Sequence, residues 1–374
     1  LRADPKRKGL LYAGTERGMY ISFDDGANWQ KFQLNLPIVP ITDLAIKNDN
    51  LIAATQGRSF WMIDDLTPIH QLSASLMKED VILFKPQDSY RMGGGNGRTS
   101  KTAGTNHPGG VAINYFIKEL GEKEVASLSI HDANGKHIKT YSTKPDKEKK
   151  EEKLSVKDGN NIFYWNMMYP GAESVKGMIL WWASLNGPMA LAGDYKVTLT
   201  VGETTKSQKF TIIKNPVSET SLADAKAQFD FINDINEKVT EVHKALKNVK
   251  KVRAQVNTLK KSIKDKKKHK ALLDYASTLI KDMTKVEETL YQTKSKSNQD
   301  PLNFPIRLNN KLAHLNSLTR IGSYAPTQQA IDFKNEINKE IDKELAKLYD
   351  LFDNRVKTLN QKVKDSQIDL IQLD

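Results

Sequence analysis

Two pairs of adjacent carboxylates are the first candidates for chemistry in this 374-residue sequence: Asp24 with Asp25, and Asp64 with Asp65. Glycosidases use two carboxyl groups, one as the acid and the other as base or nucleophile, so such pairs raise a glycosidase hypothesis. Neighbouring residues of a strand point to opposite faces, however, and neither pair can aim both carboxylates at one substrate. We therefore interpret both pairs as structural.

Other catalytic groups are not found in a recognisable pattern. None of the seven histidines stands in an H-x-x-x-H or H-E-x-x-H spacing, so no local zinc site is predicted. The absence of cysteine excludes disulfides and thiolate ligands, and no G-x-S-x-G motif occurs. Glycines gather between Gly93 and Gly110, but no Gly-Lys-Ser/Thr follows, which favours a surface loop over a phosphate-binding loop. We predict no catalytic residue, no metal ligand and no cofactor.

Basic residues are concentrated in one stretch. The net charge is +12, and residues 244–270 hold twelve cations against the single acid Asp265. The run has no interleaved aromatic residues, and its cations fill positions left by an apolar stripe, which favours a solvated helix face over a nucleic-acid site. We expect no specific nucleic-acid partner. An anionic lipopolysaccharide or an acidic glycan is a partner that such a face could meet.

A turn motif near the N-terminus organises the elements that must position these residues. The pattern S-x-D-x-G-x-x-W is formed by Ser22, Asp24, Gly26 and Trp29, with Asn28 where Thr is usual. Asp24 is expected to accept hydrogen bonds from backbone N–H groups of the turn, and Gly26 permits a positive φ. Trp29 is predicted to fold back as a buried apolar plug. Because these residues satisfy one another, the motif is predicted to be structural.

A repeat follows this motif. Residues 15–25 and 55–65 align without a gap at an offset of 40, a period that suits β-propeller blades. Short strands are predicted at 41–46 and 51–54 between the two copies. The second copy lacks the glycine and tryptophan of the turn, so we interpret it as the last blade.

With these motifs, residues 9–72 resemble the final blades of bacterial Asp-box (BNR-repeat) β-propeller proteins, related to sortilin-type receptors and often labelled glycosyl hydrolases. The most specific part of the resemblance is residues 54–66, and it continues through 164–171 to 302–310, so it covers most of the chain. It implies architecture more than activity, because the hydrolase label often rests on repeat similarity alone.

The resemblance implies the C-terminal portion of a secreted or cell-envelope protein, in the periplasm or at the outer cell surface, with a non-catalytic role in protein or glycan binding or in scaffolding. Sialidase-like propellers draw an arginine cluster, a tyrosine nucleophile and an acid from several blades, whereas this segment offers Arg17, Arg58 and Tyr20. The alternative is a glycoside hydrolase whose active site lies in upstream blades. Whether the parent protein is an enzyme stays open at this point.

Three parts are predicted, β first and α last. Residues 1–75 form the last blade or blades of a propeller, 80–215 an antiparallel immunoglobulin- or fibronectin type III-like β-sandwich, and 218–374 a four-helix-type bundle. Regular short strands with turn signals, among them the hairpin signal Asn134-Gly135, support the sandwich. Apolar residues at spacings of three and four support the helices, and Ser221 with Asp224 is expected to cap the first of them. No apolar run reaches the roughly 18 residues of a membrane helix, so no span is predicted.

Two further expectations concern contacts. Trp181 and Trp182 are predicted to lie on a strand at 178–183 and to point to opposite faces, one into the core and the other towards a sugar or, as we favour, a neighbouring domain. Arg58 and Trp61 are further candidates for ligand or interdomain contacts. The sequence starts at Leu1 and holds about one and a half blades, so we expect upstream blades in the same parent chain or in a separate one.

Overall fold

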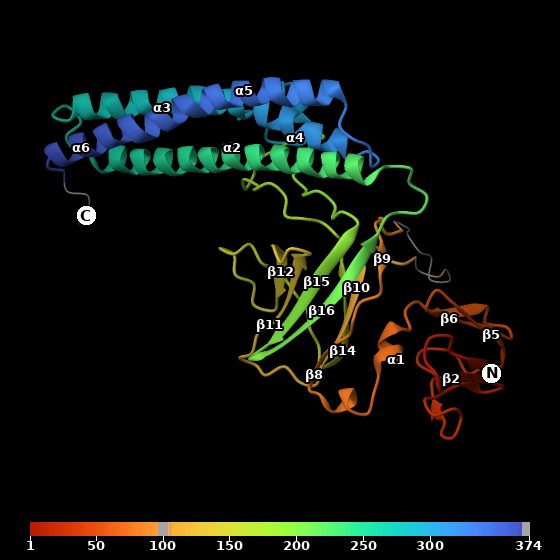
Figure 1. Cartoon of the computed structure of the whole chain (residues 1–374). Helices are drawn as coiled ribbons and strands as arrows, with labels where there is room; N and C mark the ends of the chain where they lie inside the picture. The colour runs from red at the N-terminus through yellow and green to blue at the C-terminus, as the bar shows by residue number, and fades with distance from the viewer. Residues whose placement is uncertain (96–103, 105, 369–374) are drawn as a thin grey trace. The chain divides into compact units, whose positions relative to one another are not determined.

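The computed structural model describes residues 1–95, 104 and 106–368. The predicted glycine-rich loop therefore lies partly outside the described residues. The chain divides into two compact units, one of residues 1–167 with 192–216 and the other of residues 168–191 with 217–374. The first is built of mostly antiparallel sheets, one of them curled into half a barrel, and the second is helical (Figure 1).

The first 66 residues of the β unit form two small antiparallel sheets in sequential strand order. The first holds β1 (Arg2–Ala3), β2 (Leu11–Thr15), β3 (Gly18–Ser22) and β4 (Gln30–Lys31). The second holds β5 (Ile41–Lys47), β6 (Asn50–Thr55) and β7 (Phe60–Ile63), so the strands predicted at 41–46 and 51–54 are present. Both sheets contribute to one apolar cluster, in which Leu10, Tyr12 and Leu66 are fully buried.

Short helical segments then lead to two larger sheets. These segments are α1 (Thr67–Gln71) and a 3₁₀ turn (Leu76–Lys78). The three-stranded sheet has the order β14 (Gly159–Trp165), β10 (Val111–Ile117), β8 (Val81–Leu83). The six-stranded sheet has the order β13 (Glu152–Lys153), β12 (His137–Ser142), β11 (Ala126–Asp132), β15 (Gly193–Val201), β16 (Thr204–Ile213), β9 (Ser89–Tyr90).

The larger sheets are organised by a short hairpin turn and by a shared aromatic core. The Asn134-Gly135 turn joins β11 to β12, with Gly135 at φ 79°, a conformation that glycine adopts without strain. Asp132 accepts hydrogen bonds from the backbone N–H groups of Asn134 and Lys136, both at 2.9 Å. Trp165 is fully buried, with its ring 6.1 Å from that of Phe210, so strands from both sheets share one core.

Long helices make up the second unit and lie lengthwise beside one another (Figure 1). They are α2 (Leu222–Ser262), α3 (Lys270–Leu290), α4 (Leu308–Thr319), α5 (Gln328–Asp350) and α6 (Lys357–Asp365), with a 3₁₀ turn at Asp300–Leu302. A π-helical stretch, Leu351–Val356, joins α5 to α6, so the last predicted helix continues through both. The predicted cap at Ser221 is present, because its Oγ accepts from Asp224 N at 3.0 Å. Among the described helices, none is long and apolar enough to cross a membrane.

One predicted strand is absent. Residues 178–183 contain no strand and belong, with the rest of Met168–Leu191, to the helical unit. We call Met168–Leu191 the strap. Its backbone N–H groups at Ile179 and Ser184 donate to the hydroxyl of Tyr291 and to Ala313 O, at 3.3 and 3.0 Å, rather than to a neighbouring strand. The apolar run was therefore wrongly predicted to be a strand, because its backbone is bonded to the helical unit.

Candidate binding groove on the helical unit

The strap is fixed to α2 by a buried histidine. His243 is fully buried, its Nδ1 donates to the backbone carbonyl of Glu173 on the strap, and its Nε2 accepts from Asn309 Nδ2 at 3.2 Å. A carbonyl can only accept and the Asn309 Nδ2 group can only donate, so these two bonds correspond to the neutral ring with its proton on Nδ1. Burial lowers the pKa of His243, in agreement with a neutral ring. Lys247 adds an ion pair to the Glu173 carboxylate at 2.9 Å.

Two buried asparagines of the helices, Asn236 and Asn316, hold the strap at a second point, the backbone carbonyl of Asn186. The carbonyl of Asn186 accepts from Asn236 Nδ2 of α2 at 2.9 Å and from Asn316 Nδ2 of α4 at 3.1 Å. Asn316 also donates to Asn236 Oδ1 at 2.9 Å, and both amide side chains are buried. Buried amides that lack partners are costly, so this network selects one position for the strap on the helices.

The two tryptophans of the strap lie between these anchors. Asn310 accepts from Trp181 N at 2.7 Å and donates to Trp181 O at 2.9 Å. Trp182 follows with a positive φ of 49° and is 76% exposed, while Trp181 is half-buried. Their ring centroids are 6.0 Å apart. Neither ring lies fully in the core, as was expected of one of them, and a left-handed backbone rather than strand alternation turns Trp182 outward.

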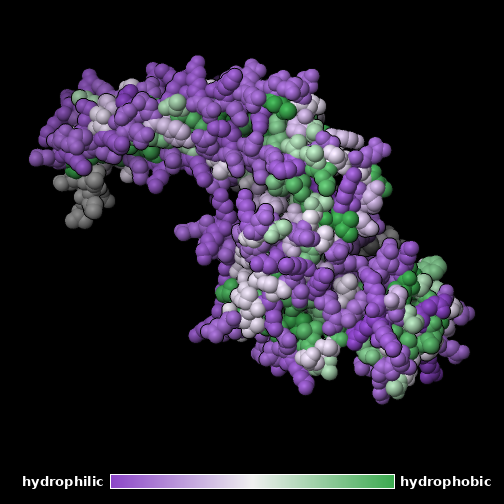
Figure 2. All heavy atoms as spheres, viewed as in Figure 1, coloured by the Kyte–Doolittle hydropathy of each residue, from purple (hydrophilic) through white to green (hydrophobic). Residues whose placement is uncertain are grey.

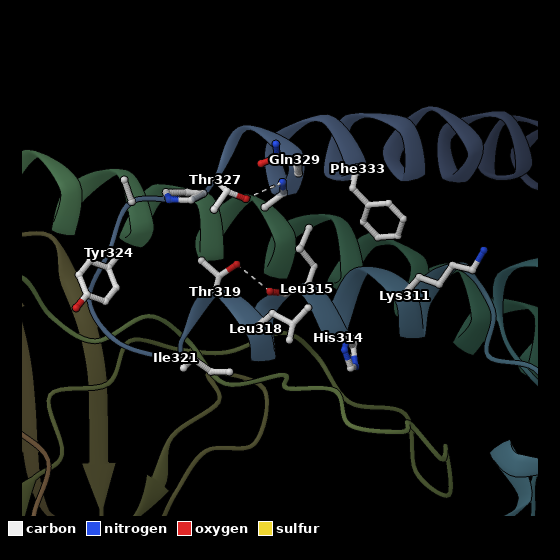
Figure 3. A pocket seen from close by; sticks show the side chains of 13 residues that line it. Lys311, His314, Leu315, Leu318, Thr319, Ile321, Tyr324, Thr327, Gln329 and Phe333 are labelled. Atoms are coloured by element: carbon white, nitrogen blue, oxygen red, sulfur yellow. Dashed lines mark hydrogen bonds between the residues drawn. The ribbon is translucent and has the colours of Figure 1, made fainter.

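A hollow of about 300 Å³ begins at these rings and continues into a second hollow of about 560 Å³. Lys311, His314 and Phe333 line both, so we treat the two as one groove and call it the aromatic groove. Figure 3 shows the larger hollow, with α4 contributing Lys311, His314 and Leu318 on one side, Phe333 of α5 on the other, and the connecting loop at one end. The residues that complete the two linings are Trp181, Trp182, Ile306, Leu315, Thr319, Ile321, Tyr324, Ala325, Pro326, Thr327, Gln329 and Ala330.

The groove is apolar and open to solvent. Ile321 is 75% exposed and Tyr324 is 72% exposed, and Leu318 and Phe333 are exposed as well. Figure 2 shows hydrophobic residues gathered near α4 and the start of α5, while most of the helical unit's visible face is hydrophilic. Contiguous exposed apolar groups of this kind mark interaction sites on soluble proteins.

The polar groups of the groove are few, and two of them are already used. Thr319 Oγ1 donates to Leu315 O at 2.8 Å, and Thr327 Oγ1 accepts from Ala330 N at 3.2 Å as the cap of α5 (Figure 3). Lys311 is exposed and makes no ion pair with any described residue. The groove therefore offers apolar contacts together with the Lys311 cation, the His314 ring, the Tyr324 hydroxyl and the Gln329 amide.

Sequence reasoning identified Trp181 and Trp182 but missed the rest of this groove. The missed residues come from α4, α5 and the loop between them, which meet the strap only in the folded unit. One signal was present: Ile321 and Tyr324 stand in a connection between helices, where polar residues are usual.

The turn around Asp24 forms as predicted. Ser22 Oγ donates to Asp24 Oδ1 at 2.8 Å, and Gly26 N donates to Ser22 Oγ at 2.9 Å. Asn28 donates twice to Asp24, from its side-chain amide at 2.7 Å and its backbone N–H at 2.8 Å. These bonds, with the Asn28 side chain first among them, lower the pKa of Asp24. Gly26 has φ 90°, the positive value that was expected.

Trp29 does not form the predicted buried plug. Trp29 is 40% exposed. Its ring lies over the turn, where a methyl group added at Gly26 would stand 3.6 Å from it. The core of this region is already filled by Leu10, Tyr12 and Met19. Trp29 therefore covers the motif from outside.

Arg58 and Trp61 lie together in the second repeat. Trp61 Nε1 donates to Arg58 O at 2.9 Å, and Arg58 N donates to Thr55 Oγ1 at 3.2 Å. Trp61 is half-buried against the N-terminal core and lines a hollow of about 40 Å³, close to the volume of one water molecule. We therefore interpret Trp61 as a residue that packs against the N-terminal core.

The carboxylate pairs occupy unlike environments. Asp65 accepts from the backbone N–H and the hydroxyl of Thr67, at 2.9 and 2.6 Å, and from Asn114 Nδ2 at 3.1 Å. Asp64 and Asp25 are exposed, and Asp25 occupies a turn with φ 57°. Among the described residues, no three histidines and acids lie where they could hold a metal ion.

No protein-family model matches the chain, and a search of curated proteins finds no match for it.

Proposed function

We propose that this chain is the non-catalytic C-terminal region of a secreted or cell-envelope Asp-box propeller protein, and that its helical unit binds a polypeptide segment of a partner protein in the aromatic groove. The Asp-box turn and its 40-residue repeat support the first part of the proposal. In it, residues 1–75 are terminal propeller blades, residues 80–215 are an immunoglobulin-like sandwich, and upstream blades are a further partner. The observation that carries the second part is the groove itself.

The chemistry of the groove favours a polypeptide over a sugar. A sugar offers many hydroxyls and needs several hydrogen-bonding groups beside a stacking ring, whereas apolar side chains outnumber polar ones in this lining and its threonine hydroxyls are used within the protein. The polar groups that remain are on Lys311, His314, Tyr324 and Gln329. Leucine, isoleucine and aromatic side chains of a partner would instead bury the exposed Leu318, Ile321 and Tyr324.

Charge specifies the partner further. Lys311 lies on the wall shared by both hollows and is not neutralised by any described residue. A carboxylate on the bound segment would pair with it beside apolar anchors, where water is partly excluded. The expected ligand is therefore a short segment with two or more large apolar residues and an Asp or Glu between or next to them.

A direct test uses a phage-displayed library of random peptides selected on the purified chain. Enriched peptides should carry the apolar and acidic pattern, and Ile321→Asp or Trp182→Ala should weaken their binding about thirtyfold, the effect of a hot-spot residue worth about 2 kcal/mol. The matched control is Ile38→Asp, which changes an equally exposed isoleucine (72% against 75%) of the β unit.

Two outcomes would contradict this function. Peptides that bind the Ile321→Asp variant as well as the unaltered chain would remove the groove as their site. Selective binding of acidic glycans on an array, lost in Trp182→Ala, would instead favour the glycan-binding alternative, which the exposed ring of Trp182 beside Lys311 supports. The other alternative, a glycoside hydrolase with its active site in upstream blades, leaves the function of this groove unchanged.

A further inference from the structure

A second surface of the helical unit lies at the end where α2 turns into α3 and where α6 ends (Figure 1). We call residues 260–274 and 361–368 the basic tip. The α3 and α6 helices pack against each other, and the Lys362 Nζ of α6 stands 5.4 Å from the ring centre of Tyr275 on α3, which joins the two segments. This surface does not share a residue with the aromatic groove.

Cations dominate the basic tip. Residues 260–274 hold seven lysines and two aspartates, and residues 361–368 hold two lysines and one aspartate, which gives nine cations against three carboxylates. All the lysines except the half-buried Lys260 are exposed. They are Lys260, Lys261, Lys264, Lys266, Lys267, Lys268, Lys270, Lys362 and Lys364.

The chain does not neutralise these charges internally. No lysine of the basic tip forms an ion pair with a described residue, and Lys260 donates instead to Ser277 Oγ at 2.8 Å. Elsewhere on the same helix, Lys247 pairs with Glu173 and Arg253 with the buried Glu287. Lys247 and Arg253, which lie earlier on α2, are thus paired, whereas the lysines of the basic tip are left to the solvent.

Repulsion between lysines and the uncompensated N-terminus of α3 both make the basic tip electrostatically unfavourable in the chain by itself. Lys266, Lys267 and Lys268 are consecutive in the turn that joins α2 to α3, and like charges crowded together in this way repel one another. The N-terminus of α3 carries the positive end of the helix dipole, yet its first turn holds no acidic residue and its N-cap makes no side-chain bond. An external anion would relieve both conflicts.

The residue types indicate which anion fits. The cations are lysines throughout, and lysine acts as a mobile point charge, whereas arginine recognises single phosphates or bases through a planar fork. The basic tip contains no Phe, Tyr or Trp, and the ring of the neighbouring Tyr275 is half-buried and packed against Arg355 and Lys362 rather than presented for nucleic-acid bases to stack on. Five lysines fall within residues 264–270, at the projecting turn between two helices, where they can approach one flat surface together.

We propose that the basic tip binds the phosphate-bearing headgroups of an anionic membrane surface. Clusters of four to eight lysines near such a surface are attracted by its negative potential, and the attraction falls off within a Debye length. This contact is electrostatic and peripheral, and it is independent of the aromatic groove.

The test measures co-sedimentation of the full chain with vesicles of phosphatidylcholine alone and with vesicles that also contain phosphatidylglycerol. Binding is expected only to the latter and should be lost on raising the salt from about 0.1 M to about 1 M. Changing Lys264, Lys266, Lys267 and Lys268 to Gln should lower the partition coefficient by about a hundredfold to a thousandfold, from about 1 kcal/mol per lysine.

The control changes four exposed lysines of the β unit, Lys123, Lys136, Lys157 and Lys209, to Gln, which removes the same charge. It should retain most of the vesicle binding, and far-UV circular dichroism checks that both variants are folded. Equal losses in the two variants would show attraction by net charge alone and would overturn the proposal. Failure to bind anionic vesicles would also overturn the proposal. It would be overturned as well if the four lysines of the tip were needed for binding to duplex DNA or polygalacturonate and the chain did not bind vesicles.

Discussion

Asn310 holds the backbone of Trp181 at both its N–H and its carbonyl group. The Oδ1 atom accepts at 2.7 Å and the Nδ2 atom donates at 2.9 Å, from a side chain that is 4% exposed on α4. One amide side chain thus supplies the donor and acceptor that a neighbouring strand would supply in a sheet. This contact lets an apolar segment lie extended against helices and present Trp182 at the groove.

Asn310→Ala should release this part of the strap. Two partly buried backbone groups lose their partners, so the free energy of unfolding of the helical unit should fall by roughly 1–3 kcal/mol. Tryptophan emission should shift to longer wavelength as Trp181 gains solvent. Asn360→Ala, at an exposed asparagine of α6, is the control and should change neither quantity. An unaltered emission spectrum in Asn310→Ala would mean that the strap is held without this contact.

The buried His243 should make the helical unit sensitive to acid. Burial lowers its pKa in the folded state, so the unfolded chain binds more protons than the folded one as the pH falls through the ordinary histidine value of 6.5. The stability that the neutral ring provides is therefore present above that value and declines below it, until the folded pKa is reached.

The measurement compares His243→Gln with the unaltered chain by urea unfolding between about pH 8 and about pH 5. The variant should be less stable at the higher pH, because it replaces a buried ring that has two hydrogen-bond partners. The difference between the two proteins should shrink as the pH falls. A difference that is constant across this range would show that His243 does not titrate on unfolding.

Short-range signals in the sequence predicted much of this fold. The Asn134-Gly135 turn, the Ser221 cap and the Asp24 turn form as expected, because each depends on residues within four positions of one another. The long helices were also predicted, since their apolar stripes repeat over many turns. These features are decided locally or by periodicity.

The strap and most of the groove could not be predicted in this way. The hydrogen bond from Trp181 N to Asn310 spans 129 residues, and the bond from His243 to Glu173 spans 70. An apolar run such as residues 178–183 fits a strand or an extended segment on helices equally well, and only its hydrogen-bond partners distinguish the two. Trp29 was predicted to be buried because its size favours burial, but the core beneath it was already filled by nearer residues.

The turn around Asp24 should depend more on the Asp24 carboxylate than on the Trp29 ring. Asp24→Asn keeps the size of the side chain but places an NH₂ group opposite the Asn28 amide, in place of the oxygen that accepts from it at 2.7 Å. Asp25→Asn is the matched control, because Asp25 makes no side-chain hydrogen bond with a described residue and Asn tolerates its positive φ of 57°. Trp29→Ala removes a ring that is already 40% exposed, so we expect a cost of about 1–2 kcal/mol rather than the roughly 3–5 kcal/mol of a buried aromatic.

Hydrogen exchange of the Gly26 and Asn28 amides reports on this turn directly, since both donate to side chains of the motif. Exchange should accelerate in Asp24→Asn and stay unchanged in Asp25→Asn. In the unaltered chain, the lowered pKa of Asp24 means that its contribution is present above the ordinary aspartate value of 3.8 and is lost as the pH falls through the folded value. Protection should therefore decline in acid, and less so in Asp24→Asn. If Trp29→Ala accelerates exchange more than Asp24→Asn does, the ring rather than the carboxylate holds the turn together.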